Sequence, residues 1–236
     1  LEGTQVSAGG GVNIGGLDFS TDDNTNVPGG GSDGVVGVIP YGGFFASHRV
    51  NEDVAVGFGL YGNFGSMLDY GNSWSGRYFV QEASLLGMSL VPSVAYRFND
   101  QWSVGVGLNA MNGYMNTKLA VDNTPTDLTD FNDGRAEFED DVWGFGGNAG
   151  IIFQPEEGTR FGLAYTSKVD LDFEDNFSIK GVQISGTGAG GGLSDAALTD
   201  AYNRLNGTKT RVDMSVPQTV TLSAFHQLNE CWTLVA

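Results

Sequence analysis

Cysteine, histidine and proline are all scarce in this chain of 236 residues. The only cysteine is Cys231, and the two histidines are His48 and His226. One cysteine excludes an intrachain disulfide and a cysteine-ligated zinc cluster, and two histidines leave few ligands for any other zinc site. We therefore expect no cofactor and no bound metal.

Basic residues are also few. The chain has 11 Lys and Arg against 28 Asp and Glu, which gives a net charge of −17. Nucleic-acid binding requires basic patches that displace counterions from phosphates, so this balance argues against a nucleic-acid partner. It also disfavours direct attraction to anionic lipid headgroups.

Long apolar runs are missing. No stretch reaches the roughly 18 consecutive apolar residues that a membrane helix needs. The longest uncharged runs, such as 3–17 and 101–117, are interrupted by Gly, Ser and Asn. Interrupted runs of this kind are typical of membrane β-strands, in which only alternate residues meet lipid.

A short phrase occurs three times, at 50–54, 98–102 and 228–232. Each copy has an apolar residue, Asn, an acid, a variable residue and then Val or Trp. Asn and Asp tolerate the left-handed backbone of tight hairpin turns. The phrase therefore predicts three hairpin turns with a left-handed residue in each.

Alternating residues follow the first two copies of this phrase. Large apolar side chains occupy every second position, and the positions between them are mostly Gly, Ala, Ser or Asn. After the first copy the large residues are Val54, Val56, Phe58 and Leu60. A soluble sandwich would bury one face and carry charges on the other. A small, uncharged second face instead predicts a barrel with lipid outside and a polar lumen inside.

The whole pattern predicts an all-β, antiparallel transmembrane barrel. The expected strands are 5–14, 35–48, 54–63, 86–98, 102–115, 142–153, 160–173 and 217–228, with a ninth that opens at Trp232. Short turns alternate with long loops near 15–34, 65–85, 116–141 and 174–213. In outer-membrane barrels the short turns are periplasmic and the long loops extracellular. Both ends of the chain look cut, so we expect residues 1–236 to form part of a larger barrel.

The last long loop carries a helical pattern. Leu198, Ala201, Tyr202 and Leu205 have the spacing of one apolar helix face, and Gly207 can end the helix. Such a face must cover something apolar. Neighbouring loops and a ligand groove are equally compatible with the pattern.

Two short patterns match a dinucleotide-binding motif and a nucleophilic Ser/His pair, but neither has the structural context that its function requires. Gly57, Gly59 and Gly62 match a dinucleotide fingerprint, but the residues that follow do not begin the helix that this site requires. Ser223 and His226 fall on opposite faces of a strand, without an orienting acid. We find no convincing active site and expect that the protein is not an enzyme.

Several ordered blocks resemble the FadL-type outer-membrane transporters of long-chain fatty acids and hydrocarbons. The blocks are AVGFGLYGNFG at 55–65, WSGRY at 74–78 and PSVAYRFNDQWSVGVGLNA at 92–110. WGFGGNAG at 143–150 and RFGLAY at 160–165 are similar to the next strands of that family, in the same order. The resemblance covers most of the chain and is weakest in the long loops.

This resemblance implies a fourteen-stranded barrel in the outer membrane of a gram-negative bacterium, plugged by an N-terminal hatch. The chain would supply about the first eight or nine strands. The implied partners are a long-chain fatty acid or hydrocarbon ligand, outer-membrane lipid and lipopolysaccharide, and the implied assembly is a monomer. The ligand would be captured between loops 116–141 and 174–213, pass to an interior site and leave sideways beside a kinked third strand. Transport would be passive.

The predicted lateral opening is Gly62, Asn63, Phe64 and Gly65. Two glycines in four residues weaken a strand ladder and permit a bulge, although Gly65 could instead simply begin a loop. The candidate partners of a ligand carboxylate are Arg77, Lys118 and Lys168, the last inward-facing by strand parity. The candidate apolar contacts are Phe64, Leu68, Trp74, Leu198, Tyr202 and Leu205.

Three other functions fit parts of the pattern. The first is a transporter of the same family for aromatic or alkane hydrocarbons. The second is a structural or adhesive outer-membrane barrel without transport. The third is a soluble, glycine-rich β-sandwich.

Overall fold

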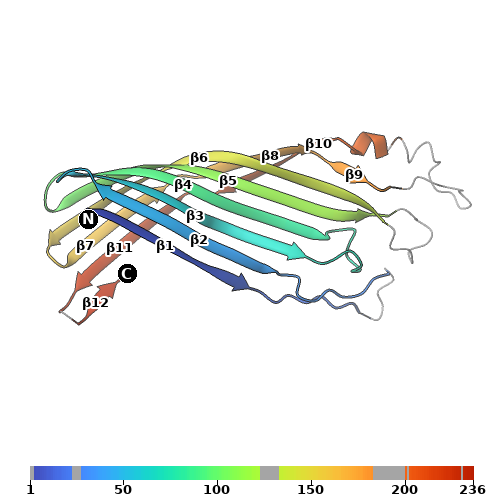
Figure 1. Cartoon of the computed structure of the whole chain (residues 1–236), viewed down its shortest axis with the longest axis horizontal. Helices are drawn as coiled ribbons and strands as arrows, with labels where there is room; N and C mark the ends of the chain where they lie inside the picture. The colour runs from blue at the N-terminus through green and yellow to red at the C-terminus, as the bar shows by residue number, and fades with distance from the viewer. Residues whose placement is uncertain (1–2, 23–27, 123–132, 183–199, 201, 230) are drawn as a thin grey trace, which may run out of the picture.

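The computed structural model describes residues 3–22, 28–122, 133–182, 200, 202–229 and 231–236. They form an antiparallel sheet that curls into a half-barrel (Figure 1). Its strands are β1 (Thr4–Ile14), β2 (Val38–Arg49), β3 (Val54–Asp69), β4 (Glu82–Arg97), β5 (Trp102–Val121), β6 (Gly134–Glu156), β7 (Thr159–Thr166), β8 (Val169–Asn176), β9 (Ser178–Lys180), β10 (Lys209–Val216), β11 (Thr219–Gln227) and β12 (Thr233–Val235). The expected all-β barrel class is confirmed.

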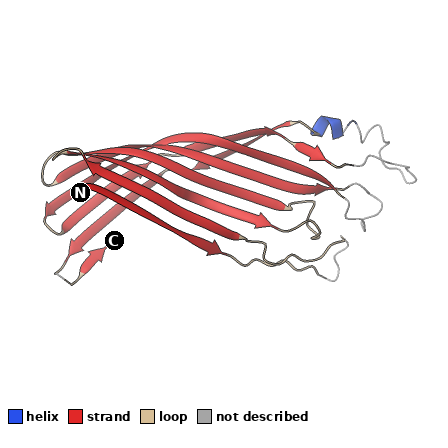
Figure 2. Cartoon of the chain, in the orientation of Figure 1, coloured by secondary structure: helices blue, strands red, loops and turns tan. Residues whose placement is uncertain are grey.

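Neighbours in the chain are neighbours in the sheet. The ten-stranded sheet runs β1-β2-β3-β4-β5-β6-β7-β11-β12, with β9 paired to β6, while β8 and β10 form a separate two-stranded sheet. Short turns lie at one end of the half-barrel and the long connections lie at the other (Figure 2). A short helix includes residues 202–205. Within the described residues, no helix has the length and apolar character to cross a membrane.

The two faces of the sheet differ as the alternation predicts. Large apolar side chains project from the outer face, where Phe145 and Leu222 are 74% and 76% exposed. Their strand neighbours on the inner face are small, as in the rungs Gly57↔Ser93 and Gly162↔Ser223. Exposed apolar side chains over a whole sheet face are compatible with lipid as the surrounding solvent.

Several strands exceed their expected lengths. β3 continues to Asp69, β5 continues to Val121 and β6 begins at Gly134, so the connections after β3 and β5 are shorter than the predicted loops 65–85 and 116–141. Polar residues near these ends still pair across strands, as in the rung Glu82↔Lys118. In contrast, the expected strand 160–173 is interrupted at residues 167 and 168, which separate β7 from β8.

The three predicted hairpin turns are present and share one geometry. In each, the Asn side-chain oxygen accepts backbone N–H groups from the second and third residues after it, at 2.8–2.9 Å, as Asn99 does from Gln101 and Trp102. The expected left-handed backbone is wrong for the first two turns, because no non-glycine residue among those described has a positive φ; Glu230 of the third turn lies outside the described residues. The Asn side chain closes the turn instead.

We predict that Asn99→Ala lowers the free energy of unfolding by about 1 kcal/mol, since two turn N–H groups lose their protein acceptor. Urea unfolding of the protein in detergent micelles measures this change. Asn99→Asp keeps an acceptor oxygen and is the matched control. Equal stability of Asn99→Ala and the wild type would contradict a structural role for the side chain.

Candidate functional site: a gap in the barrel wall beside an apolar lumen cluster

The third strand contains the predicted bulge. Gly62 pairs with Met88 but Phe64 pairs with Gly87, so Asn63 is an extra residue with no rung of its own. Its side-chain amide donates a hydrogen bond to the hydroxyl of the buried Ser89. The alternative that Gly65 begins a loop is wrong, because the β3–β4 ladder continues to the rung Asp69↔Glu82.

A gap in the wall begins at this bulge. The β2–β3 ladder ends at the rung Gly43↔Tyr61, and backbone pairing between the two chain segments resumes only at the isolated bridge Val36↔Leu68. Between these points, residues 62–67 of β3 have no ladder partner on β2, although both segments are fully described. We call this interruption of the ladder the wall gap. Pro40 lies opposite it and has no N–H to donate, which prevents a complete ladder there.

The bulge also changes the face on which β3 side chains lie. A one-residue shift moves every following side chain to the opposite face of a sheet. Phe64, paired with Gly87, therefore points into the lumen, where the ring lies directly over the glycine. Leu68 lies on the same inner face.

Phe64 meets an apolar cluster on the inner face of β4, β5 and β6. We call it the lumen cluster. Its buried members are Met111, Phe138, Val169, Leu171 and Phe173, and its partly buried members include Phe64, Leu85, Met115, Val142 and Met214. Apart from Phe64, these residues were not expected from the sequence. The signal was the appearance of Leu85, Met111 and Met115 at inward positions that are otherwise mostly small.

At the end of the wall gap that is farther from the short turns, a folded loop around Trp74 closes the interruption. Trp74 is only 7% exposed and contacts Phe19 edge-on and Tyr70 face-on, with ring centroids 5.1 and 4.3 Å apart. Its indole N–H donates to the carbonyl of Val80 at 2.7 Å. Gly29, with φ +140°, lies so close to the backbone of Ser75 that a Cβ would stand 2.7 Å from the Ser75 nitrogen. We call these packed residues the loop cap.

Arg77 anchors the loop cap from inside. Its guanidinium is fully buried and pairs with Asp133 at 2.7 Å, and it also donates to the Pro28 carbonyl at 2.5 Å and to the Tyr78 hydroxyl at 2.7 Å. Burial raises the pKa of Tyr78 above its usual value; the neighbouring guanidinium opposes this shift and Asp133 adds to it. These bonds join three long connections into one unit.

The other two candidate cations are also paired with carboxylates of the chain. Lys118 Nζ lies 2.7 Å from Glu82 and 3.6 Å from Glu137, in a row that the register places on the outer face. Lys168 Nζ lies 2.9 Å from Asp170, with its side chain 62% exposed. The structure therefore does not bring Arg77, Lys118 and Lys168 together at one ligand position.

The predicted contacts in the last loop lie beyond the end of β9. The Tyr202 hydroxyl donates to the carbonyl of Ile179 at 3.2 Å, which holds the short helix against β9. Leu205 is exposed. Leu198 falls outside the described residues.

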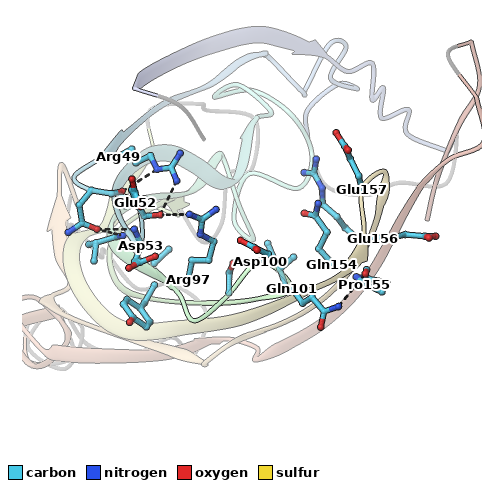
Figure 3. Close-up of a pocket in the computed structure, with 18 residues that line it drawn as sticks. Arg49, Glu52, Asp53, Arg97, Asp100, Gln101, Gln154, Pro155, Glu156 and Glu157 are labelled. Atoms are coloured by element: carbon cyan, nitrogen blue, oxygen red, sulfur yellow. Dashed lines mark hydrogen bonds between the residues drawn. The ribbon is translucent and has the colours of Figure 1, made fainter.

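A cavity of about 800 Å³, lined by charged as well as apolar residues, opens at the other end of the half-barrel, among the short turns (Figure 3). Arg97 donates to the Glu52 carbonyl at 2.8 Å, and Arg49 donates to the same carbonyl at 2.9 Å. The lining also includes Arg160 and the acids Glu52, Asp53, Asp100, Glu156 and Glu157. An apolar molecule that left along the barrel axis would have to cross this charged mouth.

A wall of lipid-facing antiparallel strands with short turns at one end and folded loops at the other defines the class of outer-membrane β-barrels. The chain belongs to the family described as "Outer membrane protein transport protein (OMPP1/FadL/TodX)", whose sequence profile matches residues 10–236. It is 29% identical over 205 residues to Outer membrane protein P1 of Haemophilus influenzae, covering 77% of this chain and 41% of that protein. It is also 28% identical over 155 residues to the Long-chain fatty acid transport protein of Escherichia coli, covering 55% of this chain and 34% of that protein. Both the family and these relatives place the chain in the gram-negative outer membrane.

Solved structures share the fold. A Pseudomonas aeruginosa FadL homologue superposes with a TM-score of 0.68 at 17% identity, over 96% of this chain and 56% of that one. The Ralstonia pickettii toluene transporter TbuX superposes with a TM-score of 0.59 at 22% identity, over 97% and 60%. The chain thus spans less than half the length of the curated relatives named above and somewhat more than half of these structures.

We predict that Arg77→Met loosens the loop cap and leaves the barrel wall folded. Loss of one partner of a buried ion pair costs about 3 kcal/mol or more. If the cap opens locally, amide exchange at residues 74–77 should rise by roughly 100-fold or more. Lys168→Met removes an exposed pair of small energetic value and is the control. Unchanged exchange in Arg77→Met would contradict the anchoring role.

Proposed function

We propose that the protein moves hydrophobic molecules passively across the outer membrane and releases them sideways through the wall gap. The observation that carries this proposal is the interrupted ladder between β2 and β3, next to an inward apolar cluster that includes Phe64. Membership of a family of transport proteins supports it. The names of the relatives suggest long-chain fatty acids as one ligand class.

The two available exits differ in cost. Leaving through the short-turn mouth would carry an apolar ligand past charged side chains of both signs, among them Arg49, Arg97 and Glu156, and desolvating such groups without a polar partner costs free energy. Leaving through the wall gap carries it from an apolar cluster toward the outer face, where Val56, Phe58 and Met88 are exposed. The sideways route therefore keeps the alkyl part of the ligand in contact with apolar side chains.

The described site residues divide into four roles under this proposal. Phe64 and Leu68, with Met111, Met115 and Phe138, contact the alkyl part of the ligand on the inner face. Trp74 and Arg77 hold the loop cap that forms the upper rim of the gap. Asn63 shapes the bulge through its bond to Ser89. Tyr202 and Leu205 belong to the loops where capture would begin.

We predict that a disulfide across the wall gap blocks uptake. Ile39→Cys with Gly65→Cys, in a Cys231→Ser background, joins two positions where a Cβ on Gly65 would lie 3.4 Å from the Ile39 side chain. Oxidation should lower the uptake of radiolabelled oleate by cells expressing the protein by about tenfold or more, equivalent to a barrier raised by about 1.4 kcal/mol. Reduction should restore it.

The matched control is Phe45→Cys with Gly59→Cys, a rung inside the intact part of the same ladder. Its oxidation should leave uptake unchanged. Normal uptake through a protein that is fully cross-linked at Ile39 and Gly65 would reject the sideways route.

A second candidate function is transport of neutral hydrocarbons. It is favoured by the ion pairs of Arg77, Lys118 and Lys168, since each candidate partner of a ligand carboxylate already binds a carboxylate of the chain. Binding a ligand acid at these positions would require breaking one of these pairs. Binding an alkyl chain in the lumen cluster requires no such exchange.

For this second function we predict that dodecanoate and 1-dodecanol bind with affinities within roughly threefold of each other, a difference below 1 kcal/mol. We also expect that Lys118→Met leaves their ratio unchanged. Isothermal titration of both ligands against the wild type and this variant measures the ratio. A tenfold selective loss of dodecanoate binding in Lys118→Met would instead assign Lys118 to the ligand carboxylate.

A further inference from the structure

A second interruption lies in the wall, on the far side of the lumen cluster. The β6–β7 ladder ends at the rung Asn148↔Thr166, and beyond it β8 pairs only with β10. β6 regains a partner on this side only where Arg135, Ala136 and Glu137 pair with β9. Residues 138–146 of β6 therefore have no ladder partner on the side of β8, although both strands are fully described. We call this line between β6 and β8 the seam.

β8 lies out of the plane of the wall but still pairs with β10. The rungs Thr219↔Thr166 and Val216↔Val169 are three residues apart on both strands, so β7–β8 and β10–β11 are one continuous hairpin in a single register. Its far half, β8 with β10, leans over the inner face of β6. We call this half the ribbon.

Two glycines of β6 make this position sterically accessible. A Cβ on Gly144 would collide with the backbone oxygen of Asp170, and a Cβ on Gly146 would stand 2.9 Å from the Val169 side chain. Gly147 lies on the opposite face, where a Cβ would meet only a carbonyl oxygen at 3.5 Å. The ribbon thus rests on the wall through backbone and side-chain contacts that a larger inward residue would prevent.

The contact across the seam is mainly apolar. Val169, Leu171 and Phe173 are fully buried and form the part of the lumen cluster that the ribbon contributes, while Asp170, Asp172 and Glu174 alternate with them on the exposed side. At its ends the seam is crossed by hydrogen bonds. Gly147 and Ser167 exchange bonds of 2.8 and 2.9 Å, and the Glu174 N–H donates to Asp140 at 2.6 Å. No rung joins the strands between these points, in the part of the chain that the structure describes.

We propose that the seam is a second lateral opening, through which the alkyl part of a hydrophobic ligand slides between β6 and the ribbon into the lumen cluster. The proposal rests on the proposed transport function and adds an entry route to it. An alkyl chain can replace the contacts of Val169, Leu171 and Phe173 with Met111 and Phe138, and it needs no hydrogen-bonding partner.

The outer face beside the seam fits the same ligand. Phe145 and Trp143 project outward at its lower end and are exposed. The next outward positions on β6 are Asp141 and Glu139. The seam thus runs from an apolar to an acidic level of the outer face, and the alkyl end of a ligand would insert at the apolar level, beside Phe145 and Trp143. The wall gap and the seam both open onto the lumen cluster, through Phe64 on one side and Leu171 on the other.

A disulfide at the lower end of the seam tests the proposal. Gly146→Cys with Ser167→Cys, in a Cys231→Ser background, joins positions where a Cβ on Gly146 would lie 2.7 Å from the Ser167 hydroxyl. We expect oxidation to lower the initial rate of oleate uptake by cells by about fivefold or more, a barrier change of about 1 kcal/mol. Reduction should restore the rate. The control is Gly162→Cys with Ser223→Cys, which cross-links a rung of the intact β7–β11 ladder and should leave uptake unchanged.

An opposite substitution gives an independent readout. Gly144→Ala pushes the ribbon away from β6, so we expect uptake to become faster and amide exchange in β8 to increase, while Gly147→Ala changes neither. An oxidised Gly146→Cys, Ser167→Cys protein that transports at the wild-type rate would overturn the second opening and leave the transport function intact. Absence of uptake in the wild type, relative to cells without the protein, would overturn the transport function itself.

Discussion

Backbone hydrogen bonding is the constraint on which this structure depends. In lipid, an N–H or C=O group that leaves its strand ladder finds no water to replace the lost partner, so membrane strands are expected to pair along their full length. The short strand-to-strand turns and the unbroken β5–β6 ladder follow this expectation, and the β4–β5 ladder lacks only the rungs of Val91 and Pro92, where proline has no N–H to donate. Against that background, a place where the ladder stops is informative. The two long interruptions, the wall gap and the seam, border the same apolar cluster, which ties them to one another and to the proposed path of a ligand.

The small residues of the inner face serve the same arrangement from inside. A lumen lined by Gly, Ser and Ala leaves room for other parts of the molecule to lie against the wall. Gly87 accepts the ring of Phe64, and Gly144 accepts the backbone of β8. Large apolar side chains, among them Met111, Met115 and Phe138, gather in the lumen cluster, while Phe45 and Tyr61 stack on each other at another level of the same face. The apolar site is therefore built where several large apolar side chains take positions that are mostly small along the inner face.

Much of the wall could be predicted from the sequence, because strand alternation and turn chemistry are local signals. The Asn turns and the bulge after Gly62 were found in this way, although the turns are closed by the side chains of Asn99 and its equivalents, and the first two turns have no left-handed residue. Strand ends were harder to place, since β5 continues through polar residues that pair only with polar partners on neighbouring strands.

The candidate site was less accessible to sequence reasoning. Arg77 looked available for a ligand, but its burial depends on Asp133, a residue 56 positions away in the chain. The departure of β8 from the wall likewise depends on Gly144 in another strand, where a Cβ would collide with the backbone oxygen of Asp170. Neither relation leaves a periodic trace in one sequence. Strand alternation did place Met111 and Met115 on the inner face, where they are larger than their mostly small neighbours.

The continuous hairpin of β7–β8 and β10–β11 has a mechanical consequence. The half made of β7 and β11 is held between neighbouring strands of the wall, and the half made of β8 and β10 projects over the lumen as a two-stranded ribbon. The position of the far end of the ribbon therefore depends on where the ribbon joins the wall. The ribbon joins the wall at the two short breaks Ser167–Lys168 and Pro217–Gln218. A small change of angle there would move the far end of the ribbon by a much larger distance. The free width of the lumen could thus evolve through substitutions at two joints that no ligand touches.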